Sequence, residues 1–60
     1  MTQYINVDIT HVRNGEWYAY VPSFDLGTCA SSEDKVRYSI YRLIEESQGL
    51  HSFVVIWRTV

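Results

Sequence analysis

The chain has 60 residues, 47% hydrophobic and 20% charged, a composition typical of one small globular domain over residues 1–60. Its formal net charge of −2 at pH 7 argues against a surface built for nucleic-acid phosphates or an anionic membrane. The longest apolar run, residues 53–57, is too short to cross a bilayer, and a single cysteine cannot form an internal disulfide.

Residues 3–12 alternate between apolar and polar side chains, which predicts a half-buried strand. Asn14 and Gly15 follow and predict a tight turn, because both tolerate a positive φ. A second strand is expected from about residue 16 to Val21, where Pro22 ends it because proline cannot donate a ladder hydrogen bond.

The length of this turn leaves two possible registers. A two-residue loop places Ile9 opposite Tyr20, whereas a three-residue loop with a left-handed Gly15 places Ile9 opposite Ala19. We favour the second register, because it separates the side chains into two consistent faces. One face is apolar, with Ile5, Val7, Ile9, Trp17, Ala19 and Val21, and the other holds Asn6, Asp8, Tyr18 and Tyr20.

The second half of the chain predicts a short strand, a helix and a last strand. Residues 22–28 are rich in turn formers and lead into a strand around residues 28–30. Residues 31–34 (SSED) predict a helix start, and the helix runs to about Gln48 before Gly49 stops it. Its sheet-facing stripe is Val36, Ile40, Leu43, Ile44 and Ser47. Residues 51–59 form the last strand, with Phe53, Val55 and Trp57 on one face and Val54, Ile56 and Arg58 on the other.

These elements predict an α+β fold with the order β-β-β-α-β, in which one helix packs on one face of a four-stranded, mostly antiparallel sheet. This order resembles that of HicB-like antitoxin domains, which have a partial RNase H-type fold. Residues 15–22 (GEWYAYVP) are similar to the family's aromatic second strand, and residues 25–29 (DLGTC) to its following Asp-Leu-Pro-Gly-Cys stretch. The resemblance implies a protein that binds and masks a small RNase toxin of the HicA type. Many HicB proteins continue into a DNA-binding part, whereas this sequence ends at Val60, so the resemblance does not imply operator binding.

The sequence offers no convincing catalytic, cofactor or metal residues. RNase H-type chemistry needs several carboxylates around divalent metal ions, and only Asp8, Glu45 and Glu46 suit it, while the last strand carries none. His11 and His51 lack neighbours at metal-ligand spacing, so we interpret them as structural. Cys29 has no nucleophile signature, and a partly buried packing role is expected for it. We therefore expect a protein that is not an enzyme.

The aromatic face predicts contact with a partner. Tyr4, Tyr18 and Tyr20 could stack on single-stranded RNA bases, but few cations accompany them and Asp8 lies among them, which favours a protein partner. One helix cannot cover both faces of a sheet whose last strand is apolar on both sides, so self-association, most simply as a homodimer, is also expected. The candidate partner-binding residues are Tyr18, Tyr20, Val54 and Ile56.

We therefore expect a non-catalytic, antitoxin-like interaction domain that occludes a partner such as a small RNase toxin. The start of the chain lacks a secretory signal and the lone thiol suits a reducing compartment, so a cytoplasmic location is expected, without membrane attachment. Two alternatives stay open: an inhibitor of a host protein complex encoded by a phage or mobile element, and a small single-stranded RNA-binding module.

Overall fold

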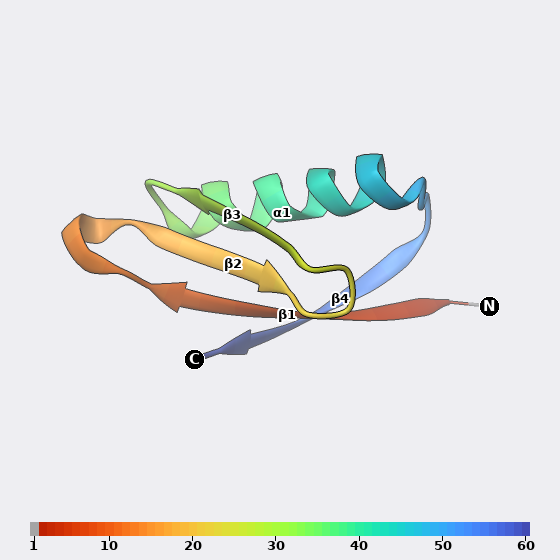
Figure 1. Ribbon diagram of the computed structural model, residues 1–60, viewed down its shortest axis with the longest axis horizontal. Coiled ribbons are helices and arrows are strands. Elements are labelled where there is room, and N and C mark those ends of the chain that lie inside the picture. Colours follow the sequence, from red (N-terminus) through yellow and green to blue (C-terminus); the bar gives the residue numbers. More distant parts are fainter. Residues whose placement is uncertain (1) are drawn as a thin grey trace.

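The computed structural model describes residues 2–60 as a four-stranded sheet with one helix lying across one of its faces (Figure 1). The sheet order is β3-β2-β1-β4; β2 is antiparallel to both β1 and β3, and β4 is parallel to β1. The predicted α+β class and the order β-β-β-α-β are confirmed. The strands are β1 (Gln3–His11), β2 (Trp17–Val21), β3 (Leu26–Ala30) and β4 (Phe53–Thr59), and the helix is α1 (Glu33–Gln48).

The β1–β2 hairpin has the three-residue loop. Ile9 lies opposite Ala19 and His11 lies opposite Trp17, as the favoured register requires. The loop Arg13–Gly15 forms a single 3₁₀ turn in which Asn14 has φ 63° and Gly15 has φ 75°. Both residues tolerate this left-handed region, so the turn forms without strain and sets which side chains share a face.

The helix begins and ends where its sequence predicts. The Ser32 hydroxyl accepts a hydrogen bond from the Lys35 N–H at 3.2 Å, and Glu33 and Asp34 lie in the first turn. Gly49 ends the helix with φ 64°. One member of the predicted sheet-facing stripe is wrong: Ser47 is exposed, and the buried stripe is Val36, Ile40 and Ile44. A serine in the last turn keeps its hydroxyl in water and gains nothing from burial.

The hydrophobic core lies between α1 and the inner face of the sheet, and it is centred away from β4. The helix packs over β2 and β3, so Val55 and Trp57 on β4 stay half-buried. Two helix side chains reach toward β4: Arg37 places its guanidinium 4.7 Å from the Trp57 ring centre, and Tyr41 stacks on Phe53. The buried residues are Ile5, Val7, Ile9, Ala19, Val21, Val36, Ile40, Ile44 and Phe53.

The Ser32 cap provides a test of the helix start. We expect Ser32→Ala to lower the free energy of unfolding by about 1 kcal/mol, because one N–H of the first turn then has no partner within the chain. Urea denaturation followed by far-UV circular dichroism measures this change. Ser31→Ala is the matched control, since the Ser31 hydroxyl only accepts a 3.5 Å contact from the exposed Lys35 ammonium. An equal loss in both variants would contradict the capping role.

Candidate partner-binding surface

The sheet face opposite α1, here called the outer face, carries all four predicted partner-binding residues. Strand registers place Asp8 opposite Tyr20 and Thr10 opposite Tyr18 on one side of β1, and Tyr4 beside Val54 on the other. Because side chains alternate along a strand, the members of this face follow from those pairs. They are Tyr4, Asn6, Asp8, Thr10, Tyr18, Tyr20, Gly27, Cys29, Val54, Ile56 and Arg58.

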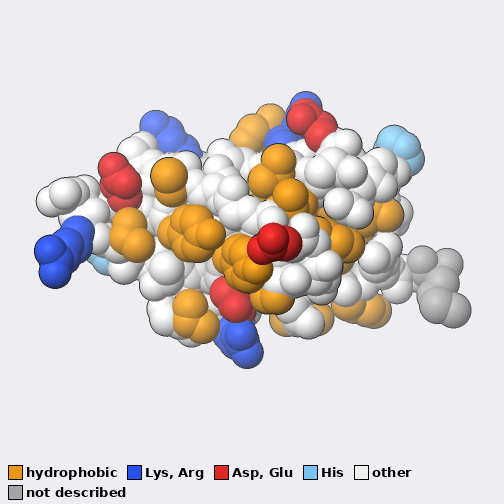
Figure 2. Space-filling view, viewed as in Figure 1, with side chains coloured by type: hydrophobic (Ala, Val, Ile, Leu, Met, Phe, Trp, Pro, Cys, Tyr) orange, Lys and Arg blue, Asp and Glu red, His pale blue; other side chains and the backbone are white. Residues whose placement is uncertain are grey.

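Large side chains of the outer face reach the solvent. Tyr4 is 66% exposed, Tyr18 38%, Val54 44% and Ile56 46%, while Tyr20 is half-buried. In Figure 2, hydrophobic side chains come to the surface in several places below the helix, and acidic and basic groups lie among and beneath them. Single exposed apolar residues are ordinary in soluble proteins, but several of them gathered on one sheet face are typical of an interaction site.

The two charged side chains of the outer face neutralise each other. The Arg58 guanidinium donates to both carboxylate oxygens of Asp8, at 2.8 and 3.0 Å. The hydrogen bond to Asp8, and then the attraction of its charge, raise the pKa of Arg58. Asp8 is 19% exposed and Arg58 is 70% exposed, so the pair lies in reach of water and contributes little stability. Its main effect is that the charges of these two strand residues cancel.

Tyr20 is held in place by a residue of the β2–β3 turn. Its hydroxyl donates to the Asp25 carboxylate at 2.7 Å, and Asp25 adopts a left-handed backbone with φ 53°. Aspartate tolerates this conformation better than most residues, and the turn thereby aims its carboxylate at the tyrosine. The hydrogen bond to Asp25 is the main cause that raises the pKa of Tyr20, and partial desolvation adds to it.

This contact predicts a specific titration. In the native protein the Tyr20 phenol should lose its proton above its ordinary pKa of 10.0, and Asp25→Asn should move that pKa back toward 10.0. Stability from the contact is present below pH 10 and is lost as the pH rises through the raised pKa of the folded state. Ultraviolet absorbance of the phenolate measures the titration, and Tyr20→Phe identifies its signal. An Asp25→Asn titration identical to that of the native protein would contradict the assignment.

Gly27 allows Tyr18 to lie across β3. A Cβ atom at Gly27 would collide with the Tyr18 hydroxyl, so only glycine leaves room for this ring orientation. The ring then borders a shallow hollow of about 390 Å³ between the two β2 tyrosines. Its lining is Asp8, Thr10, Tyr18, Tyr20 and Val60, so the outer face offers a recess that a side chain of a partner can enter.

Residues weighed for chemistry lie apart from one another. His11 stacks on Trp17 with ring centres 4.7 Å apart, and His51 is exposed at the start of the β4 segment. Asp8 pairs with Arg58 on the outer face, whereas Glu45 and Glu46 lie on α1 beside Arg42. Over residues 2–60, no three His, Cys, Asp or Glu side chains come close enough together to hold a metal ion.

The expectation of a partly buried Cys29 is wrong. Cys29 is exposed, because β3 is an edge strand and Cys29 points to the outer face, which α1 does not cover. The residue thus belongs to the rim of the outer face and not to the core.

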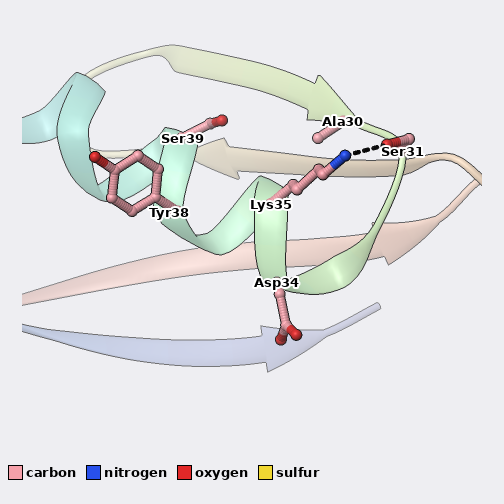
Figure 3. A pocket seen from close by; sticks show the side chains of 6 residues that line it. All are labelled: Ala30, Ser31, Asp34, Lys35, Tyr38 and Ser39. Carbon is pink, nitrogen blue, oxygen red and sulfur yellow. Dashed lines mark hydrogen bonds between the residues drawn. The ribbon is translucent and has the colours of Figure 1, made fainter.

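A second hollow, of about 500 Å³, lies between the end of β3 and the first turns of α1. The Lys35 ammonium points toward Ser31 and donates to its hydroxyl at 3.5 Å, while Asp34 points away from both (Figure 3). The charged groups of this hollow do not converge on one point, so it makes a weaker candidate site than the outer face. Its lining is Ala30, Ser31, Asp34, Lys35, Tyr38 and Ser39.

Two polar contacts of the outer face were not anticipated from the sequence. The Asp8–Arg58 pair joins residues at opposite ends of the chain, and it depends on the parallel register of β4 against β1. The Tyr20–Asp25 bond depends on the path of a turn whose sequence indicates only that the chain reverses. The alternation of β4 did contain a signal for the first contact, since it placed Arg58 on the same face as Val54 and Ile56.

Comparison with known proteins adds no relative: no family model, no curated protein and no solved structure matches this chain. In the described part of the chain, no helix is both long enough and apolar enough to cross a membrane. The outer face therefore has to be interpreted from its own geometry and chemistry.

Proposed function

We propose that this protein is a non-catalytic interaction domain that docks its outer face on a partner protein and occludes a functional surface of that partner. The proposal rests chiefly on one observation: α1 covers the inner face of the sheet over β2 and β3, while the outer face has no helix of residues 2–60 on it and leaves Tyr4, Tyr18, Val54 and Ile56 open to solvent. Tyrosines are enriched where proteins meet, because a large rigid ring buries much area at a small cost in conformational entropy.

The charge of the outer face favours a protein over a nucleic acid. Its single cation, Arg58, is engaged by Asp8 in the same chain, and Asp25 adds a carboxylate beside Tyr20. Binding of single-stranded RNA combines base stacking with cations that follow the backbone, and the outer face supplies only the rings. A partner protein with an apolar surface can pack on the outer face, and such packing does not require the outer face to carry a net positive charge.

The partner we propose is a small RNase toxin of the HicA type, and the protein would act as a HicB-like antitoxin. Support for this identity comes from the order β-β-β-α-β and from the segments at residues 15–22 and 25–29 that resemble the family. To mask a toxin, a protein needs affinity for it and enough size to cover its active surface, and it needs no catalytic groups. Four acidic side chains, Asp8, Glu33, Glu45 and Glu46, are engaged by arginines on two different faces, which is consistent with such a passive role.

The neighbouring open reading frame supplies the test. Its product is expressed alone and together with this chain, and growth of the cells and co-purification of the two proteins are measured. A toxic neighbour that is neutralised and co-purified supports the antitoxin. A neighbour that is toxic and remains unbound overturns it, and an inhibitor of a host complex becomes the better interpretation where the gene lies in a phage.

A fluorescent single-stranded oligonucleotide distinguishes the RNA-binding alternative. We expect no binding at low salt, because Arg58, the cation that residues 2–60 place on the outer face, is already paired with Asp8. Binding that weakens steeply as salt is added, and that Tyr18→Ala abolishes, would replace the proposed protein-binding function with the RNA-binding one.

A further inference from the structure

Strand β4 ends the sheet with an edge to which no other strand pairs within residues 2–60. On the side of β4 that faces β1, the Val60 N–H just beyond β4 donates to the Ile9 carbonyl at 3.0 Å. Because successive residues of a strand direct their N–H and C=O groups to opposite sides, every second residue counted back from Val60 faces β1. The remaining four, Phe53, Val55, Trp57 and Thr59, therefore direct their backbone groups outward from the sheet.

The usual protections of an exposed edge are missing from β4. Natural edge strands avoid pairing through prolines, lysines, bulges or short length. Over residues 53–59 there is no proline, glycine or lysine, and the one cation, Arg58, is turned toward Asp8. The opposite edge differs: β3 is five residues long against seven for β4, contains Gly27, and has α1 packed against it.

Apolar side chains flank the β4 edge on both faces. On the outer face Val54 is 44% exposed and Ile56 is 46% exposed. On the inner face Val55 and Trp57 are half-buried, because α1 lies over β2 and β3 and reaches β4 only through Arg37 and Tyr41. A strand added beside β4 would thus satisfy backbone groups and cover apolar side chains at the same time.

We propose that the strand added there is β4 of a second copy, paired antiparallel about a two-fold axis at Ile56, so that two four-stranded sheets become one. The positions of the outward backbone groups restrict the register. Hydrogen-bonded pairs must join members of the outward set, and the register that overlaps all of β4 joins Phe53 to Thr59 and Val55 to Trp57. In that register Ile56 lies opposite its own copy.

Self-pairing fits this edge because the side chains of two antiparallel copies of β4 complement each other. Each apolar outer-face residue meets an apolar group of the other copy: Ile56 meets Ile56, and Val54 meets the aliphatic stem of Arg58, whose charge is already paired with Asp8. The second copy also adds its own Val54 and Ile56 to the outer face, making that face continuous across the axis. The inference does not require the proposed toxin partner, because the pairing uses backbone groups of the β4 edge. Of the four candidate partner-binding residues, Val54 and Ile56 lie on β4 and stay on the outer face, whereas Tyr18 and Tyr20 lie on β2, away from this edge.

Cross-linking tests the axis. In a Cys29→Ser background, Ile56→Cys places two thiols in a non-hydrogen-bonded pair with Cα atoms about 4.5 Å apart, within the range of about 4.4–6.8 Å that a disulfide spans. We expect most of this variant to become a covalent dimer on mild oxidation. Val54→Cys is the matched control, on the same face and equally exposed, and should stay uncross-linked. Failure of Ile56→Cys to cross-link, or equal cross-linking of both variants, overturns the proposal.

Measurements on the unmodified chain make the test independent of the cysteine variants. Sedimentation at increasing concentration should reach twice the 7.0 kDa mass of the chain, and Ile56→Asp should remain at 7.0 kDa with a native circular dichroism spectrum. In hydrogen exchange, the Val55 and Trp57 amides should exchange roughly tenfold or more slowly in the dimer than in the Ile56→Asp monomer. A monomer at all concentrations, or a dimer in which these amides exchange freely, overturns the edge pairing. Neither experiment contains a toxin, so their failure leaves the proposed function untouched.

Discussion

Replacing Ile40 with alanine should leave a large part of the protein unfolded at room temperature. Ile40 is fully buried at the middle of the α1 stripe, between Val36 and Ile44. Removing a buried isoleucine side chain costs about 2–5 kcal/mol, and a core of this size supplies only roughly 3–5 kcal/mol in total. The loss is therefore comparable with the whole stability of the domain. Urea denaturation followed by tryptophan fluorescence measures it.

Tyr38→Ala is the control for Ile40→Ala. Tyr38 lies on the same helix, two positions earlier, but 66% of it is exposed and it belongs to no buried cluster. We expect its replacement to change the free energy of unfolding by less than about 0.5 kcal/mol. Similar denaturation midpoints for Ile40→Ala and the native protein would mean that this face of α1 does not seal the core.

Replacing Tyr18 with alanine should weaken partner binding by tenfold or more, on the order of 1.4 kcal/mol or above, while the fold persists. Tyr18 is exposed, borders the hollow between the two β2 tyrosines, and lies on β2, which β1 separates from β4. Its ring offers the kind of anchor that dominates interface energies. Calorimetric titration with the neighbouring gene's product measures the affinity, and circular dichroism verifies the fold.

Tyr38→Ala again serves as the control, because Tyr38 is a more exposed tyrosine on the opposite side of the molecule. It should bind the partner with native affinity. A partner that tolerates Tyr18→Ala and loses affinity with Tyr38→Ala would place the binding surface on the helix, and the proposed role of the outer face would be wrong.

Much of the fold could be predicted because its signals are local. Asn14 and Gly15 define a turn through their backbone preferences, and Ser32 and Gly49 mark the ends of α1 through capping. The favoured hairpin register followed from requiring one consistent apolar face, and the structure confirms it at Ile9 and Ala19. A register error of one residue would have exposed the whole inner face of β1, which made the correct choice strongly preferred.

Predictions failed or were incomplete where a residue's environment depended on distant chain. Cys29 was expected to be partly buried, but its strand lies at an edge. Strand β3 begins at Leu26 and not near Thr28, because pairing with β2 extends it beyond what its own sequence indicates. Ser47 was placed on the buried stripe by spacing alone, which does not show where contact between a helix and a sheet ends.

The sequence by itself determined the strands, the helix, and the division of side chains between an inner and an outer face, because alternation, helical spacing and capping act between near neighbours. Only the tertiary structure decided that β4 lies parallel to β1 at the edge of the sheet. From that placement follow the Asp8–Arg58 pair and the unpaired edge. The choice of a strand's neighbour is made by contacts between the two ends of the chain, and no local pattern specifies it.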